Sequence, residues 1–455
     1  MSDLAPLLVA LSDPVPGIRQ AAAIALGMLR DPRAGTTLGT VLSDPDAAVR
    51  GAAIEALGAI GRIESRPAVE AALGDPDPQV RSKAADALAL LPADASVAAL
   101  SAVEDDPVPE VRRAVATALG RIGTVAALDG LERLLADRHE RVRREAVLGL
   151  GGADGPARLP TLRPFLKDPA RPVRIAAAAV IGRHRDRASV EALLELLQSP
   201  EPAEKSAALV ALGQVGSLEA VPALLEAAEN PAPWVRVCAL HALGEIRSTE
   251  AGPVARVHLA DPEWSVRGSA AVALGEVGDP DDLGALLDLL RDAHPWPRRG
   301  ATYALGRLGL IEAAPRIREE LTDPAAEVRL AAVWALGRLG DDGAREALVQ
   351  LLYQCRPTPE RPTVPARPED DRSLFSDAPT RLFDATVQAL GRLSLASPDP
   401  LVRRALVDAR ERLSEEELDR SVRLPLPETA VDRVPPTVRS LFESAMSMSA
   451  DDEEP

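Results

Sequence analysis

One short motif recurs along the chain at a fixed interval, and this interval limits the fold more than any other feature. The motif has an Asp-Pro step, then Val-Arg, then Ala-Leu-Gly, as in DPEWSVRGSAAVALG at 261–275. When the first residue of the Val-Arg pair is called slot 0, slot 0 falls at Ile18 and then every 31 residues up to Val328. A twelfth copy begins at Leu382, after an insertion of 23 residues. A fixed period of about 20–50 residues predicts stacked copies of one small unit rather than separate globular domains.

Each copy predicts a pair of helices. The stretch AVPALLEAAEN at 220–230 has apolar residues at helical spacing, and a second helix follows the Asp-Pro turn from about slot −1 to slot 9. At about 100° per residue, slots 0, 4, 7, 8 and 11 share one face, and they are almost always Val, Ala, Leu or Ile. A single pair cannot bury this face, so it packs against the next copy. We therefore expect an all-α fold, an α-solenoid of about twelve helix pairs.

Three polar or small positions of the repeat have structural explanations. Slot −5 is Asp in ten of the twelve copies, where it is expected to cap the second helix. Slot 1 is Arg or Lys in eleven copies, and it is expected to pair with an Asp of its own or the neighbouring copy. Where the Asp becomes Ser199, slot 1 of that copy becomes Lys205, which indicates that the two positions are partners. Slot 9 is Gly in eleven copies, which predicts close packing and helix termination rather than phosphate binding.

These repeats resemble HEAT repeats, in particular the short type named after phycobilisome lyases. The resemblance rests on stretches such as DPDAAVRGAAIEALGAIG at 44–61, and it covers roughly residues 3–396. It implies that the second helices line the concave face of a right-handed superhelix. A proline 13 residues before slot 0 favours HEAT over armadillo repeats, and it occurs at Pro67, Pro160, Pro222, Pro253 and Pro315.

The aromatic residues predict a partner-binding surface. They make up 2% of the chain, yet all four Trp and both Tyr lie between residues 234 and 353. They sit mainly at slots −2, −1 and 6, and slot 6 points about 145° away from the apolar face, so we expect exposed rings. Exposed Trp and Tyr flanked by Arg are typical of interaction hot spots, although the rings could instead cover neighbouring leucines. The predicted partner-binding residues are Trp234, His241, Trp264, Trp296, Arg299, Tyr303, Arg307, Trp334 and Arg338.

A second candidate surface is basic. Arg113 and Arg144 both occupy slot 2, the most outward position, and Arg183 lies in the stretch GRHRDR at 182–187. Residues 101–200 carry 16 basic and 14 acidic side chains, which favours a mixed solvated surface. The alternative is that this secondary patch docks an acidic partner.

Composition and motifs exclude several classes of function. A net charge of −17 disfavours nucleic acid, and no stretch approaches the roughly 20 apolar residues that span a bilayer. The five histidines and two cysteines have no metal-ligand spacing, and no catalytic signature is present, so we expect no metal, no cofactor and no enzyme. The 49 Arg against 3 Lys indicate GC-rich bacterial coding, and the N-terminus has no basic flank followed by an apolar run.

These observations predict a cytoplasmic, non-catalytic scaffold that binds one or more proteins or peptides on the concave face. Because repeat stacks end in polar caps, we expect a monomer or weak dimer in the absence of the partner. The resemblance leaves one alternative, a bilin lyase or isomerase that attaches an open-chain tetrapyrrole to a phycobiliprotein.

The sequence predicts three regions. Residues 1–396 form the solenoid, with a Pro-rich loop inserted at 354–377, and residues 397–424 form C-terminal capping helices. Residues 425–455 comprise a linker, a possible docking helix at 437–448 and an acidic disordered tail.

Overall fold

The computed structural model describes residues 4–152, 155–354, 382, 385–390, 392–393 and 399–410. Every regular element in these ranges is a helix, which confirms the predicted all-α solenoid. The chain divides into two units, Met1–Ser217 and Leu218–Pro455, and each is described by itself. Most of the predicted insertion, and the whole of the region 425–455, lie outside the described residues. Of the predicted cap, only a helix at its beginning is described.

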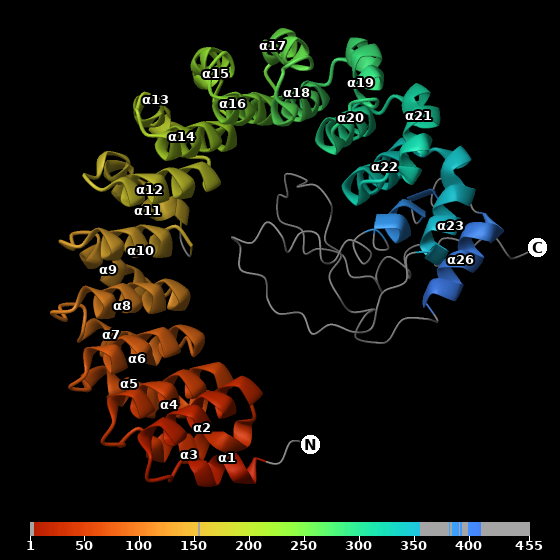
Figure 1. Cartoon of the computed structure of the whole chain (residues 1–455). Helices are drawn as coiled ribbons and strands as arrows, with labels where there is room; N and C mark the ends of the chain where they lie inside the picture. The colour runs from red at the N-terminus through yellow and green to blue at the C-terminus, as the bar shows by residue number, and fades with distance from the viewer. Residues whose placement is uncertain are drawn as a thin grey trace, which may run out of the picture. The chain divides into compact units, whose positions relative to one another are not determined.

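In the first unit, the first helices of the pairs are short and the second helices are longer. The two kinds form separate layers, in which neighbouring second helices lie side by side (Figure 1). The first helices are α1 (Ala5–Ala10), α3 (Gly35–Val41), α5 (Arg66–Ala71), α7 (Val97–Ser101), α9 (Val125–Leu134), α11 (Gly155–Leu162) and α13 (Val190–Leu197). The second helices are α2 (Pro16–Leu29), α4 (Ala47–Ile60), α6 (Pro78–Leu90), α8 (Pro109–Ile122), α10 (Glu140–Leu150), α12 (Arg171–Arg183) and α14 (Pro202–Val215).

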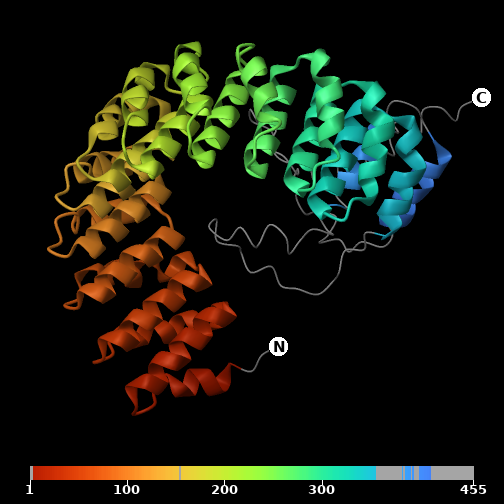
Figure 2. The ribbon, with the colours of Figure 1, turned by 45° about the horizontal axis from the view of Figure 1, so that its top comes forward.

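The second unit repeats this arrangement, and Figure 2 shows its paired helices from a second direction. Its first helices are α15 (Val221–Ala228), α17 (Ala251–His258), α19 (Leu283–Leu289), α21 (Ala314–Glu319) and α23 (Arg345–Gln354). Its second helices are α16 (Pro233–Ile246), α18 (Trp264–Val277), α20 (Pro295–Leu308) and α22 (Ala326–Leu339), followed by a helical segment at 385–390 and by α26 (Pro400–Arg410). One buried cluster of Ala, Leu and Val side chains extends through the helices of this unit.

Glycines at two slots of the second helix have different roles. Gly278 at slot 12 ends α18 in the left-handed conformation, with φ of 87°. Gly275 at slot 9 lies inside the helix, so the expectation that slot 9 ends the helix is wrong in this copy, although Gly151 at slot 9 does end α10. A Cβ at Gly275 would lie 2.6 Å from the Cα of Ala304 on α20, so this glycine lets the two second helices approach closely.

An arginine at slot 1 links successive copies. The Nη1 of Arg50 donates to the backbone carbonyl of Asp44 in its own copy, at 2.8 Å. Its Nε and Nη2 donate to the carboxylate of Asp75 in the next copy, at 2.7 and 2.8 Å, and these bonds hold the pKa of Asp75 below its ordinary value. We call this arrangement the arginine ladder. It also joins Arg19 to Asp44, Arg81 to Asp106, Arg112 to Asp137, Arg143 to Asp168, Arg236 to Asp261, Arg267 to Asp292 and Arg298 to Asp323.

The ladder corrects two expectations about the slot −5 carboxylate. Its charge partner is the arginine of the preceding copy, so Ser199 and Lys205 of one copy are not the paired positions. Arg174 of the preceding copy instead bonds Glu204, a buried glutamate that replaces valine at slot 0. The carboxylate also does not cap the helix, because Asp75 accepts the N–H of Asp77, and Asp77 is the N-cap of α6.

The first helix pair exposes apolar side chains. Ile18 at slot 0 is 44% exposed and Leu29 at slot 11 is 45% exposed, although slot 0 is buried wherever the later copies carry valine. The reason is positional, because α1 and α2 begin the described stack and no helix pair covers this side of them. The expectation of a polar cap is therefore wrong at this end of the chain.

Candidate partner-binding surface

All nine residues predicted to bind a partner lie on the second helices of the second unit. Trp234 and His241 lie on α16, and Trp264 lies on α18. The remaining six lie on α20 and α22. Because these four helices lie side by side in one layer, the candidate residues share one side of this unit (Figure 1).

Four side chains gather where α18 and α20 begin, and we call them the edge cluster: Trp264, His294, Trp296 and Arg299. The ring of Trp264 stacks on His294 at a centroid distance of 4.0 Å and meets Trp296 edge-on at 6.4 Å. The guanidinium carbon of Arg299 lies 4.7 Å from the centroid of the Trp296 ring, a cation–π contact. Both tryptophans are 41% exposed, as the sequence predicted for them. The cluster therefore presents two apolar rings to solvent, with the half-buried Arg299 beside them.

Two residues that the sequence reasoning did not single out hold this cluster in place. His294 is the N-cap of α20, and its Nδ1 accepts the backbone N–H of Trp296 at 3.2 Å. Gly268 on α18 leaves room for the second ring, since a Cβ there would lie 2.1 Å from Cδ1 of Trp296. The available signal was the glycine at slot 2, which only the second copy shares, at Gly51, and the histidine two residues before a tryptophan.

Tyr303 and Trp334 are buried, at 7% and 5% exposure, so the expectation of exposed rings is wrong at slot 6 of these two copies. Their rings stack on each other at 4.9 Å. A Cβ at Gly306 would lie 3.0 Å from Cζ3 of Trp334, which shows that this ring rests against the neighbouring helix. The slot 6 rings of these two copies therefore enter the groove between adjacent second helices, although slot 6 points away from the apolar face of its own helix.

Glu276 is the polar centre beside these rings. Its carboxylate accepts hydrogen bonds from the hydroxyl of Tyr303 at 2.6 Å and from Arg307 at 2.7 Å, and Arg247 lies 3.3 Å away. Burial and the bond to Glu276 raise the pKa of Tyr303, so its hydroxyl stays protonated and donates. Arg338 is exposed, and its guanidinium lies 5.7 Å from the centroid of Trp334.

Trp234 and His241 lie apart from the edge cluster. Trp234 is half-buried at the start of α16, and His241 is exposed on the same helix, 3.8 Å from Glu245. Within the described part of the chain, no stacked-ring contact joins either residue to Trp264 or Trp296. The structure thus divides the predicted surface into an exposed edge cluster, a buried ring pair and two outlying side chains.

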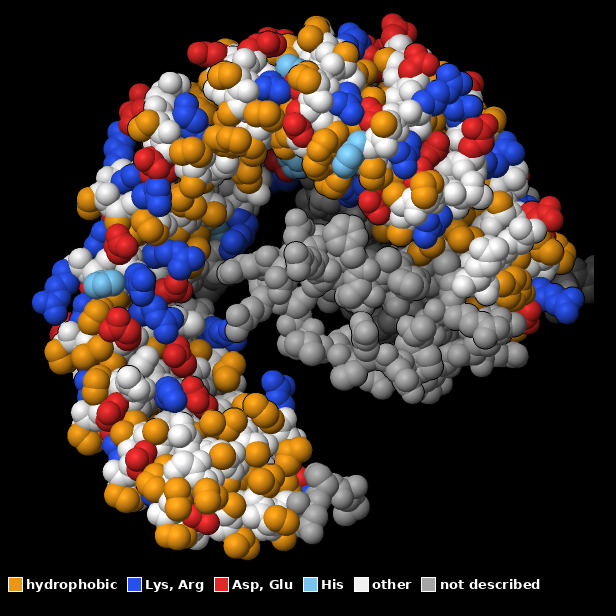
Figure 3. All heavy atoms as spheres, in the orientation of Figure 1, with side chains coloured by type: hydrophobic (Ala, Val, Ile, Leu, Met, Phe, Trp, Pro, Cys, Tyr) orange, Lys and Arg blue, Asp and Glu red, His pale blue; other side chains and the backbone are white. Residues whose placement is uncertain are grey.

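The secondary basic patch is interspersed with acidic groups. Arg113 lies 3.6 Å from Asp86, and Arg144 lies 3.1 Å from Glu145. Arg183 is exposed at the end of α12. Figure 3 shows basic and acidic side chains side by side over this part of the first unit. This distribution favours the mixed solvated surface over a docking site for an acidic partner.

The described residues bear on metal binding and on membrane insertion. They contain no group of three or more His, Cys, Asp or Glu side chains arranged to hold a metal ion. Among the helices of the described ranges, none is long and apolar enough to cross a membrane.

Comparisons with known proteins identify the type of these repeats. A family model described as HEAT repeats matches residues 4–76, 65–151, 131–208, 159–237, 190–261, 221–306 and 285–361. Yeast importin-β (Kap95p) is similar over 90% of this chain and 63% of its own, with a TM-score of 0.57 and 16% identity. A structure concerned with Kap95p binding to RanGDP gives a TM-score of 0.53, also at 16% identity. A comparison with curated proteins found no match.

A phycocyanin lyase is also among the similar structures. The complex of CpcE and CpcF from Nostoc sp. is 25% identical and covers 56% of this chain and 92% of the compared chain, with a TM-score of 0.30. This chain spans about 63% of the length of Kap95p. At 16% identity, the likeness to Kap95p is one of fold alone.

Proposed function

The chain belongs to the HEAT-repeat family, and we propose that it is a non-catalytic scaffold that binds a protein or peptide on the second-helix layer of residues 218–455. The fold is suited to this role, because stacked repeats present an extended surface of parallel helices. A solenoid of similar fold, Kap95p, does bind another protein, RanGDP. We further propose that this scaffold acts in the bacterial cytoplasm, without a cofactor, and that it is a monomer or weak dimer without its partner.

The edge cluster is the observation that carries this proposal. Trp264 and Trp296 are each 41% exposed in a chain with only 2% aromatic residues. Exposed rings reduce solubility unless a partner covers them, and Trp and Arg are the residues most enriched at interaction hot spots. His294, Gly268 and Arg299 fix the ring positions, so little side-chain entropy remains to be lost on binding.

The predicted surface is accordingly divided by membership of the edge cluster. Trp264, Trp296 and Arg299 form the centre of the proposed contact, with Trp234 and His241 further along the same layer. Tyr303 and Trp334 contribute indirectly. Tyr303 shares the carboxylate of Glu276 with Arg307, and the guanidinium of Arg338 lies near the ring of Trp334. The Arg113, Arg144 and Arg183 patch stays outside the proposed surface.

Affinity purification from the source organism tests the proposal. The bait carries Trp264→Ala together with Trp296→Ala, and the control bait carries Val257→Ala, a 69% exposed apolar residue on α17 in the other layer. We expect the control to recover the same partner as the unmodified protein and the double variant to lose it. Recovery of every partner by a folded double variant would contradict the proposed surface.

A separate measurement addresses the lyase alternative. The protein is produced together with a bilin and its acceptor protein, and the absorbance of the acceptor is recorded. The scaffold predicts that the acceptor stays without covalent pigment, whereas a lyase would attach the pigment to it.

A further inference from the structure

Three arginines occupy the same slot in the last three copies of the repeat. We call them the arginine row: Arg307, Arg338 and Arg392, all at slot 10. Arg307 is half-buried, and the carboxylate of Glu276 neutralises its charge in an ion pair. Arg338 and Arg392 are exposed, and within the described ranges neither forms an ion pair with a carboxylate. The row therefore ends in two cations whose charge the described residues do not neutralise.

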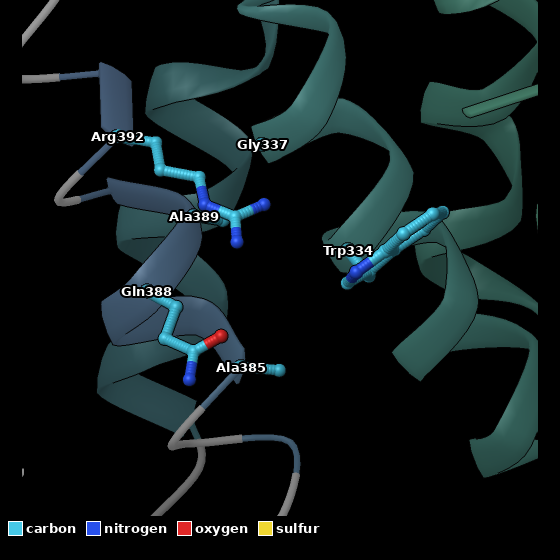
Figure 4. Close-up of a pocket in the computed structure, with 6 residues that line it drawn as sticks. All are labelled: Trp334, Gly337, Ala385, Gln388, Ala389 and Arg392. Atoms are coloured by element: carbon cyan, nitrogen blue, oxygen red, sulfur yellow. The ribbon is translucent and has the colours of Figure 1, made fainter. Parts of the chain in front are cut away.

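A shallow hollow lies beside these two cations. Figure 4 shows Gln388 and Arg392 pointing across it toward Trp334. Its floor consists of small residues, because a Cβ at Gly337 would lie 2.7 Å from the Cα of Ala389. The residues that line it are Trp334, Gly337, Ala385, Gln388, Ala389 and Arg392.

The hollow combines three groups whose chemistry suits a peptide. The amide of Gln388 can donate to and accept from a peptide backbone, and the side chain is 8% exposed, so its position is fixed by packing. Trp334 offers the edge of a ring that is otherwise covered. Guanidinium groups bind carboxylates through two parallel hydrogen bonds, which makes Arg392 and Arg338 suited to acidic side chains.

We propose that the arginine row and this hollow bind an acidic peptide segment that lies across the second helices. The proposal rests on the proposed function and names the chemistry of its partner. Neighbouring helices pack about 8–10 Å apart, and an extended chain advances about 3.3 Å per residue. Acidic side chains three residues apart in the peptide therefore match arginines on successive helices.

Charge favours a peptide over a nucleic acid at this site. The chain has a net charge of −17, which repels a long polyanion at a distance. The arginine row offers only two unneutralised cations, whereas nucleic-acid affinity requires the neutralisation of many phosphates. A short segment with two or three carboxylates is attracted by the arginine row, and its few charges are repelled only weakly by the net negative charge of the chain.

Fluorescence anisotropy with labelled nine-residue peptides tests this inference. The probe carries Glu at positions 2, 5 and 8 in a Gly/Ser background with one Leu, and the comparison peptide carries Gln at the same positions. Binding is measured for the full chain, for Arg338→Gln with Arg392→Gln, and for the matched control Arg113→Gln with Arg144→Gln. An oligonucleotide of thymidines serves as a polyanion of another class.

We expect the Glu peptide to bind the full chain and the control variant alike, and to bind the Arg338→Gln, Arg392→Gln variant at least tenfold more weakly. The Gln peptide should also bind at least tenfold more weakly than the Glu peptide. Equal binding by both variants, no binding of the Glu peptide, or tighter binding of the oligonucleotide would overturn the inference. If the edge-cluster variant still loses its partner in affinity purification, such a result leaves the proposed function standing.

Discussion

Arg112 holds Asp137, 25 residues further along the chain, through both carboxylate oxygens. Its Nε lies 2.6 Å from one oxygen and its Nη2 lies 2.9 Å from the other, while Nη1 donates to the carbonyl of Asp106 at 2.6 Å. The side chains of the pair are only 6% and 7% exposed. One arginine thus ties the turn of its own copy to the turn of the next, and this contact recurs along the solenoid.

Arg112→Ala should destabilise the protein strongly, because it leaves Asp137 buried without its cation. Removing one partner of a buried ion pair costs about 3–5 kcal/mol. Arg62→Ala is the matched control, since Arg62 and Glu64 are 46% and 68% exposed and such pairs contribute about 0–1 kcal/mol. Urea unfolding followed by circular dichroism measures both. Equal midpoints for the two variants would show that the ladder does not hold the repeats together.

Glu320 should make stability depend on pH near neutrality. It precedes the ladder residue Asp323, and burial together with that carboxylate raises the pKa of Glu320 to about 7, while Arg298 and Arg316 oppose the shift. An acid with a raised pKa stabilises the fold fully below its unfolded pKa, about 4.3, and loses this contribution as the pH rises through 7. The ladder carboxylates act in the opposite sense, because their pKa values are lowered and their contribution falls only in acid.

Glu320→Gln isolates this effect, since glutamine cannot ionise. We expect the variant to be more stable than the parent at pH 8 by at least about 1 kcal/mol, given that one unit of pKa shift corresponds to about 1.4 kcal/mol. The two proteins should converge near pH 4.5. Urea midpoints at pH 4.5, 6 and 8 provide the test, and a difference that does not change with pH would count against it.

The buried and exposed tryptophans should differ in their effect on stability. Trp334→Ala removes a ring that is 5% exposed and stacked on Tyr303, which we expect to cost about 3–5 kcal/mol. Trp296→Ala removes a ring that is 41% exposed, and we expect about 1 kcal/mol or less. Thermal unfolding compares them directly. Similar losses in the two variants would show that the edge cluster belongs to the packed core.

The period predicted the helix pairs because every copy must bury the same face against its neighbour. It also predicted the exposure of Trp264 and Trp296, since slots −2 and −1 lie at the start of the helix, near the edge of the layer. From the sequence alone, the slot 1 arginine could pair with an Asp of its own copy or with an Asp of the neighbouring copy. The structure shows that this arginine bonds the backbone of its own copy and the carboxylate of the next.

The exposure predicted from helical angles is wrong at Tyr303 and Trp334 for a physical reason. The helical angle gives the direction of a side chain from its own helix, whereas burial depends on how closely the adjacent helix approaches. Gly306 at slot 9 of α20 lets α22 approach closely, and the ring of Trp334 then lies against this glycine. A small residue at slot 6 would not reveal this groove, so the regular copies gave no signal of it.

Site-specific photo-crosslinking in cells tests the central claim most directly. A photoreactive residue replaces Glu263, which precedes Trp264 and leaves both tryptophans intact, or Val257 on the other layer. We expect one discrete protein to be attached from position 263, not from position 257, and not from position 263 when Trp264→Ala and Trp296→Ala are also present. The absence of any adduct from position 263, or the same adduct from both positions, would contradict a partner-binding surface at the edge cluster.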